Sequence, residues 1–220
     1  MYKVLVTGGS RGIGKAISEI FAENSYEVLS PGRNELELTS KGSIRSFVKL
    51  NPDGFDVIIN NAGINPINSI EDTKETDIED TVMVNMVAPI LLTRGFVPKM
   101  KERKSGRIVN IGSIWSVVSK PKRSIYGATK HGIHGLTMAL ASELSDFGVL
   151  VNTVSPGFTL TDLTKKNNSP AEISKIEEQI PLGRMAEPEE IARAVFFLGS
   201  YNNTYITGQN IVVDGGYSIQ

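Results

Sequence analysis

The sequence predicts an α/β fold in which helices cover both faces of one parallel β-sheet. Short apolar runs, such as residues 4–6 and 57–59, alternate along the chain with longer segments whose apolar residues recur at helical spacing. The runs are apolar at every position, which is typical of strands buried on both faces. The chain has 220 residues, 40% of them hydrophobic, and shows no internal repeat or linker. We therefore expect one doubly wound domain over residues 1–220.

The first half of the chain is expected to hold four strands, over residues 4–6, 26–30, 35–39 and 55–59. Helices are expected over residues 14–24, 41–50 and 76–101, the last interrupted at Pro89. Only residues 31–34 separate the second strand from the third, whereas a parallel pair needs a crossover of about a dozen residues. Either a helix is missing here or the third strand is only an extended edge segment.

The second half is expected to hold strands over residues 107–111, 149–155 and 210–213, and a helix over residues 125–145. Further helices follow up to residue 200. Residues 161–174 are polar and include the run KKNNSP, so we expect a mobile loop that could act as a lid.

Composition excludes several classes of protein. Lys and Arg total 23 against 24 for Asp and Glu, so the chain lacks the basic excess of a nucleic-acid binder. There is no cysteine and only two histidines, which excludes thiolate sites and argues against a histidine zinc site. The first strand begins at once, and no run approaches the roughly 18 apolar residues of a membrane span. We expect a cytoplasmic protein that binds neither metal, nucleic acid nor membrane.

A glycine-rich loop, TGGSRGIG over residues 7–14, joins the first strand to the first helix. Glycines allow a close approach of the backbone to a pyrophosphate, and the helix N-terminus offers free N–H groups to that anion. The spacing G-x-x-x-G-x-G favours nucleotide binding; the alternative is a loop shaped only by packing. Residues 60–63, NNAG, follow another strand at the edge where open sheets bind ligands, although a simple turn would look the same.

Tyr126 and Lys130 are four residues apart on an expected helix, so both side chains leave the same face. An adjacent ammonium group favours a phenolate and brings the tyrosine towards the range of an acid/base catalyst. The pair alone is common by chance. However, Ser113, Asn85, the dipeptide 156–157 and the DGG run 214–216 all follow, or lie near, ends of parallel strands, and therefore converge on one edge.

Taken together, these motifs resemble those of the short-chain dehydrogenase/reductase family over essentially the whole chain. The resemblance implies a single Rossmann-type domain that binds a nicotinamide cofactor. It implies that Tyr126 exchanges a proton with the substrate oxygen and that Ser113 hydrogen-bonds the same oxygen. Lys130 would hold the nicotinamide ribose and lower the pKa of Tyr126, and Asn85 would position Lys130 and a water. The residues expected to contact the cofactor are Gly8, Ser10, Arg11, Gly12, Ile13, Gly14, Arg33, Leu38, Asn60, Asn61, Ala62, Gly63, Tyr126, Lys130, Pro156, Gly157, Thr159 and Thr161.

The end of the second strand, SPGR over residues 30–33, carries no acid that would bind a ribose 2′-hydroxyl. Arg33 and Arg11 could both reach a 2′-phosphate, so NADP(H) is favoured over NAD(H), with Glu35 and Glu37 nearby as the opposing signal.

The runs GRIVNIGS (106–113) and ITGQ (206–209) look most like the 3-oxoacyl-carrier-protein reductase branch. Its members dock an acidic carrier, to which Lys104 and Arg107 could contribute, although Phe147 stands where a second base would be expected. The shortened region after the second strand instead resembles nucleotide-sugar reductases, so a keto-sugar or nucleotide-sugar substrate stays open, as does a non-catalytic NADP-binding regulator. Lys120, Lys122 and Arg123 would attract an anionic substrate or simply be solvated.

The family usually pairs the helix of Tyr126 with its copy across a two-fold axis. Small residues on this helix, Ala128, Gly132, Gly135 and Ala139, would permit a close approach. We therefore predict a homodimer or homotetramer, with His131 and His134 in structural or interface positions.

Overall fold

The computed structural model describes the backbone of residues 1–220 and the side chains of all of them except Leu163 and Asn167. Six parallel strands form one sheet in the order β2-β1-β3-β4-β5-β6. The strands are β1 (Lys3–Val6), β2 (Glu27–Leu29), β3 (Val57–Asn60), β4 (Gly106–Ile111), β5 (Val149–Pro156) and β6 (Asn210–Val213). The expected doubly wound parallel sheet is therefore confirmed.

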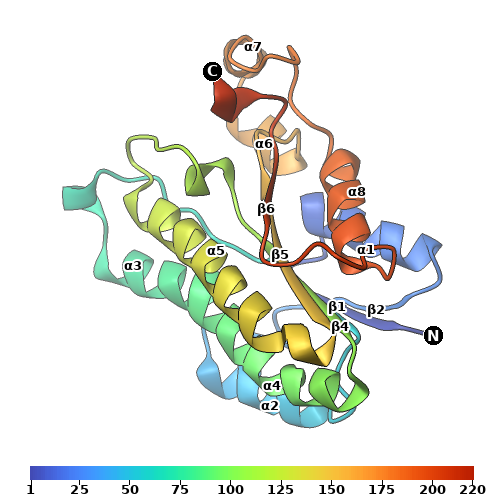
Figure 1. Ribbon diagram of the computed structural model, residues 1–220. Helices are drawn as coiled ribbons and strands as arrows, with labels where there is room; N and C mark the ends of the chain where they lie inside the picture. Colours follow the sequence, from blue (N-terminus) through green and yellow to red (C-terminus); the bar gives the residue numbers. More distant parts are fainter.

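Helices cover both faces of the sheet, with α1 and α8 on one side and α2, α4 and α5 on the other (Figure 1). Alternate residues of each strand serve the two layers, which is why the strands are apolar throughout: Leu5 packs towards α4, whereas Val4 and Val6 pack towards α1. The helices are α1 (Gly12–Glu23), α2 (Lys41–Leu50), α3 (Glu75–Val82), α4 (Ala88–Arg103), α5 (Ser124–Leu144), α6 (Asp162–Asn167), α7 (Pro170–Glu177) and α8 (Pro188–Gly199).

The strand expected over residues 35–39 does not form. The backbone N–H groups of Glu35 and Leu36 both donate to the carbonyl oxygen of Gly32, so the chain turns locally instead of pairing with β2. Leu36 is buried among the residues that pack under α2 and α4. The short connection explains this outcome, because four residues cannot carry the chain back to the start of a neighbouring parallel strand.

The helix expected over residues 76–101 is continuous from Glu75 to Arg103, and its irregularity is a π-helical stretch, Met83–Val87, rather than a break at Pro89. Pro89 lies in the first turn of α4, where its missing N–H leaves the carbonyl of Asn85 without an α-helical partner. By length and composition this 29-residue stretch, in which an 18-residue window has a mean hydropathy of 1.4, is apolar enough to cross a membrane. Packing of Leu92, Phe96 and Met100 in the core accounts for that hydropathy.

Residues 161–174, expected to be a loop, contain α6 and the start of α7. Ser169 begins α7 with a capping box: its hydroxyl accepts from the N–H of Glu172, whose carboxylate accepts from the N–H of Ser169. Thr161 caps α6 in a similar way through Thr164. Local capping therefore converts a polar segment into two short helices above the carboxyl edge of the sheet.

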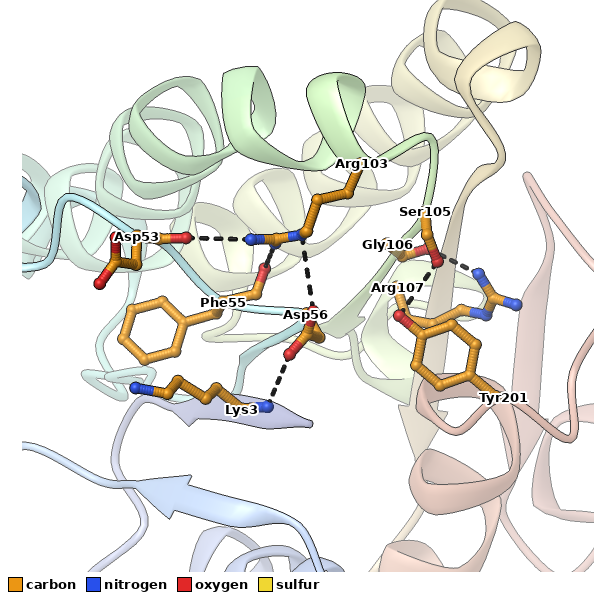
Figure 2. A network of polar contacts seen from close by, with 9 residues as sticks. All are labelled: Lys3, Asp53, Phe55, Asp56, Arg103, Ser105, Gly106, Arg107 and Tyr201. Atoms are coloured by element: carbon orange, nitrogen blue, oxygen red, sulfur yellow. Dashed lines mark hydrogen bonds and ion pairs between the residues drawn. The ribbon is translucent and has the colours of Figure 1, made fainter. Parts of the chain in front are cut away.

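Polar contacts fix the opposite, amino edge of the sheet (Figure 2). The carboxylate of Asp56 accepts a 2.7 Å hydrogen bond from the N–H of Lys3 and lies 3.6 Å from Nε of Arg103, which also donates to the carbonyl oxygens of Asp53 and Phe55. Beside them, Arg107 donates to the carbonyl of Gly106. The backbone N–H of Arg107 also donates to the carbonyl oxygen of Asp56, so the starts of β1, β3 and β4 are joined and the carboxyl edge stays available for a site.

Candidate active site

The glycine-rich loop connects β1 to α1 at the carboxyl edge of the sheet. Gly8 and Gly12 have φ angles of +69° and +53°, which a residue with a Cβ atom rarely adopts. A Cβ atom on Gly14 would lie 2.2 Å from the carbonyl oxygen of Gly8, so the helix can approach the loop only with glycine there. Arg11, the N-cap residue, makes no side-chain cap and the first turn carries no acid. The first amide groups of α1 are therefore available to an anion.

The turn after β3 is tied to this loop. Asn61 donates from Nδ2 to the carbonyl oxygens of Thr7 and Gly8, at 2.9 and 3.1 Å. The hydroxyl of Thr7 accepts in return from the N–H groups of Asn61 and Ala62. Two loops that are 54 residues apart in sequence thus form one rigid surface.

A cavity of about 750 Å³ opens above these loops, and we call it the dinucleotide cavity. Its volume is in the range of small-molecule and cofactor sites, and its wall of glycines next to an uncapped helix N-terminus fits the pyrophosphate of a dinucleotide. Of the residues expected at the cofactor, those that line it are Gly8, Ser10, Arg11, Gly12, Ile13, Gly14, Arg33, Leu38, Asn61, Ala62, Gly63, Tyr126 and Thr161.

Five of the residues expected at the cofactor do not line the cavity: Asn60, Lys130, Pro156, Gly157 and Thr159. Asn60 is buried and donates from Nδ2 to Oδ1 of Asn110 in the layer beneath α5, because its side chain alternates with that of Asn61. Gly157, next to Pro156, lets the ends of β5 and β6 come together, since a Cβ atom there would lie 2.6 Å from Cα of Asp214. Thr159 bonds back to the carbonyl oxygen of Gly157. Asn60, Gly157 and Thr159 therefore contribute to the packing of the carboxyl edge of the sheet.

Lys130 is buried behind the cavity. Its Nζ atom donates a 2.6 Å hydrogen bond to the carbonyl oxygen of Ile111, and burial lowers the pKa of the ammonium group to about 8. A Cβ atom on Gly63 would lie 3.5 Å from this Nζ and 3.4 Å from Oδ1 of Asn85. Gly63, Asn85 and Lys130 therefore meet at one point.

Asn85 holds the loop that follows Gly63. Its Oδ1 accepts from the N–H of Ile64 and its Nδ2 donates to the carbonyl oxygen of the same residue, both at 2.9 Å. Nδ2 also donates to Oγ1 of Thr129, one residue before Lys130. The π-helical stretch thus presents Asn85 to both the loop and α5.

Tyr126 lines the dinucleotide cavity from the first turn of α5. Burial raises the pKa of its phenol, while the nearby hydroxyl of Ser113 and the charge of Arg123 act in the opposite direction. The expected lowering of this pKa by Lys130 is not seen. The Nζ atom lies 5.5 Å from the centre of the ring and is bonded to Ile111, so burial outweighs the attraction. The hydroxyl of Ser113 nevertheless lies near the phenol of Tyr126, since it acts to lower the pKa of that group.

Sequence reasoning missed part of the wall. Asp80 and Val84 line the cavity from one face of the helix that leads to Asn85, a relation that their spacing of four residues could have indicated. Glu37 also lines it, and its carboxylate lies 3.5 Å from Nε of Arg33. Other residues of the wall that were not expected are Pro31, Gly32, Leu36, Thr39, Ile64 and Asp162.

Arg107 is not available to a carrier protein. It is only 6% exposed, and its guanidinium group donates to the carbonyl oxygens of Gly106 and Asn203. Of the two bases considered for docking, only Lys104 lies on the surface.

Residues 38–218 match a family model described as enoyl-(acyl carrier protein) reductase. The chain is 36% identical to the 3-oxoacyl-[acyl-carrier-protein] reductase FabG of Vibrio cholerae serotype O1, over 96% of this chain and 95% of that protein. A solved short chain dehydrogenase/reductase family protein superposes with a TM-score of 0.89 at 32% identity, covering 99% and 97% of the two chains. ElxO with bound NADP superposes with a TM-score of 0.93 at 29% identity over 100% of both chains. The chain therefore belongs to the short-chain dehydrogenase/reductase family of NAD(P)-dependent oxidoreductases.

Proposed function

We propose that this protein reduces the carbonyl group of a 3-oxoacyl thioester to an alcohol, with NADPH as the reductant and Tyr126 as the acid. The observation that carries the proposal is that Tyr126 lines the dinucleotide cavity and that the hydroxyl of Ser113 lies close enough to its phenol to lower the pKa. Two hydroxyl groups on one carbonyl oxygen suit the reduction of C=O, in which charge develops on oxygen.

The residues divide the work as follows. Bound NADPH would supply a hydride to the carbonyl carbon. Tyr126 donates its phenolic proton to the oxygen, and Ser113 hydrogen-bonds the same oxygen. Because burial raises the pKa of Tyr126, the phenol stays protonated at neutral pH, which is the form that reduction requires. Asn85 fixes the loop after Gly63 and, through Thr129, the turn of α5 that carries Lys130.

Lys130 would bind the nicotinamide ribose from behind Gly63. A Cβ atom at Gly63 would stand 3.5 Å from Nζ, so a group lying over this glycine is within reach of the ammonium. With a pKa of about 8, the ammonium form predominates at neutral pH and donates hydrogen bonds. The glycine-rich loop and the N-terminus of α1 would hold the pyrophosphate.

The preference for NADPH rests on Arg11 and Arg33, which both line the dinucleotide cavity. A guanidinium group can bind a 2′-phosphate through bidentate hydrogen bonds. Arg33 shares its charge with Glu37, and Arg11 forms no ion pair among the described side chains. Arg11 is therefore the stronger candidate for the phosphate contact.

The substrate assignment is supported by the 3-oxoacyl reductase that resembles this chain over nearly its full length. The direct test follows NADPH consumption spectroscopically with a short 3-oxoacyl thioester, with NADH as the parallel reaction. We expect turnover with NADPH and a lower kcat/KM with NADH. Binding of NADPH without consumption would contradict the proposed substrate and return attention to keto-sugars and nucleotide-sugars.

We also propose a homodimer or homotetramer formed through α4 and α5. Met138 on α5 is 51% exposed and Ile90 on α4 is 37% exposed, so this surface carries apolar side chains that a partner would cover. The small residues Ala128 and Gly135 on α5 would permit a close approach of the partner helix. Light scattering at micromolar concentration tests this, and a monomeric mass would contradict it.

A further inference from the structure

A second cavity, of about 530 Å³, lies beside the first turns of α5 and the 3₁₀ turn Ile114–Ser116. Its wall contains Lys120, Lys122 and Arg123, and we call it the basic cavity. None of the residues that line it is Asp or Glu. None of the three cations forms an ion pair among the described side chains. In a chain whose net charge is −1, this gives one cavity a wall with three cations, and the nearby carboxylate of Asp72 is engaged by the hydroxyl of Ser69.

An aromatic cluster orders one of these cations. The rings of Trp115, Phe158 and Tyr217 meet edge to face, with centroids 5.2 to 6.2 Å apart. The Nζ atom of Lys120 lies 5.7 Å from the centroid of Trp115 and 5.8 Å from that of Phe158. A cation–π contact restrains the lysine without using its N–H donors, which stay available to a ligand.

The basic cavity adjoins the reacting residues. Trp115 lines it, and the N–H of Trp115 donates a 3.2 Å hydrogen bond to Oγ of Ser113. Arg123 lies one helical turn before Tyr126 and donates to Oδ1 of Asn65 at 3.3 Å. Ser113 and Tyr126 do not line this cavity themselves, but Trp115 of its wall bonds Ser113 and the charge of Arg123 acts on Tyr126. A substrate whose carbonyl lies at Tyr126 would therefore have its remaining part near these cations.

We propose that the basic cavity binds an anionic oxygen group of the substrate, a phosphate or a carboxylate, so that this enzyme selects anionic carbonyl compounds over neutral ones. The inference rests on the proposed function in one respect, the position of the carbonyl at Tyr126. Lysine and arginine donors match both anions, and Trp115 with Ile70 gives the cavity an apolar side for the carbon chain. The run 120–123 is thus a specificity element rather than a merely solvated loop.

The first experiment compares substrates that differ only in the anionic group. Acetoacetyl-phosphopantetheine is paired with acetoacetyl-pantetheine, and acetoacetate with its methyl ester, all with saturating NADPH. We expect kcat/KM to be about tenfold higher for the anionic member of at least one pair, a difference that one charge-assisted contact supplies. The pair that discriminates identifies the group as phosphate or carboxylate. In the Lys120→Gln/Lys122→Gln variant this ratio should fall to within about twofold of one.

The second experiment measures binding without turnover. Trp115 is the only tryptophan of the chain, so its fluorescence reports on this cavity alone. Inorganic phosphate and acetoacetate are titrated in the presence of saturating NADP⁺, which occupies the dinucleotide cavity. We expect a saturable change that needs at least about fivefold more anion in the Lys120→Gln/Lys122→Gln variant. Lys49→Gln, on the exposed end of α2, is the matched control and should behave as wild type.

The outcomes separate this inference from the proposed function. If no thioester is reduced but the Trp115 response to an anion depends on Lys120 and Lys122, the thioester assignment fails and the anion site stands. If the thioesters are reduced and the two members of each pair have equal kcat/KM, the inference is overturned and the function stands. A Trp115 response without any discrimination between substrates overturns it as well, because the anion would then not belong to the substrate.

Discussion

The Nζ atom of Lys130 donates a 2.6 Å hydrogen bond to the backbone carbonyl oxygen of Ile111, the last residue of β4. This bond ties the second turn of α5 to the end of the central strand, two residues before Ser113. The two hydroxyl groups that would act on the substrate therefore belong to elements that one buried cation holds together. Burial of that cation costs stability, because the ammonium loses its hydration and gains no carboxylate.

Lys130→Met should abolish turnover and raise the free energy of unfolding. A pKa lowered from 10.5 to about 8 means that the folded state disfavours the charge by roughly 3 kcal/mol at pH 7. Below pH 8 wild type carries this cost in full, and it is relieved as the pH rises from 8 to 10.5. The advantage of the variant in urea unfolding should therefore shrink over that range. A variant less stable than wild type at pH 7 would show that the bond to Ile111 outweighs the desolvation.

Tyr126→Phe should lower kcat by about 10²–10⁴-fold, because the general acid is lost. The dissociation constant for NADPH, measured by fluorescence titration, should change by less than about threefold, since the ring is retained and only the hydroxyl is lost. Ser113→Ala is the companion variant and should also lower kcat while keeping NADPH bound. Unchanged turnover in Tyr126→Phe would exclude the proposed mechanism.

Glu37→Gln should strengthen the preference for NADPH. Glu37 lines the dinucleotide cavity, and its carboxylate forms an ion pair with Nε of Arg33 at 3.5 Å. Its removal frees that arginine and ends the repulsion of a 2′-phosphate, which should raise the ratio of kcat/KM for NADPH over NADH by about three- to tenfold. Glu35→Gln, whose carboxylate accepts from the N–H of Gly32 and does not line the cavity, serves as the control. A ratio that moves towards NADH would contradict this account.

Gly14→Ala should destabilise the protein by about 1–3 kcal/mol and weaken NADPH binding. The new Cβ atom would lie 2.2 Å from the carbonyl oxygen of Gly8 and 2.4 Å from Nδ2 of Asn61, so both loops of the cavity would have to move. Gly42→Ala is the matched control in α2, where the Cβ atom would meet only Oγ of Ser40 at 3.6 Å. That variant should gain about 0.4–1 kcal/mol in thermal or urea unfolding. Equal stabilities of the two variants would refute the argument from close approach.

Arg107→Ala should lower stability by about 2–4 kcal/mol, because it leaves a hole and deprives buried carbonyl groups of donors. The turnover of the folded enzyme should not change, since Arg107 lies at the amino edge of the sheet (Figure 2) and lines neither cavity. Arg45→Ala, on an exposed position of α2, should stay within about 0.5 kcal/mol of wild type in the same urea titration. A change in kcat for Arg107→Ala would mean that the two edges of the sheet are coupled.

Periodicity alone was sufficient for the framework. The strands buried on both faces are apolar at every position, as at Val4, Leu5 and Val6, and such a run fits few other environments. The same reasoning failed at residues 35–39, where the alternation of Glu35, Leu36, Glu37 and Leu38 looks like an edge strand. There a turn, and not a strand, buries Leu36. The alternation of apolar and polar residues indicates which side chains are buried, but it does not indicate how the backbone is hydrogen-bonded.

The sequence by itself determined which motif follows which strand, where the glycine-rich loop lies, and that Ser113, Tyr126 and Lys130 are the candidate reacting residues. Each of these depends on local spacing along one element. Only the tertiary structure decided that burial would dominate the pKa of Tyr126 and that Arg107 would be inaccessible. It also decided that Lys120, Lys122 and Arg123 would line one cavity with Trp115. Burial of a side chain and the walls of a cavity depend on segments that are far apart in the chain. No local sequence pattern gives the distance between such segments in the folded protein.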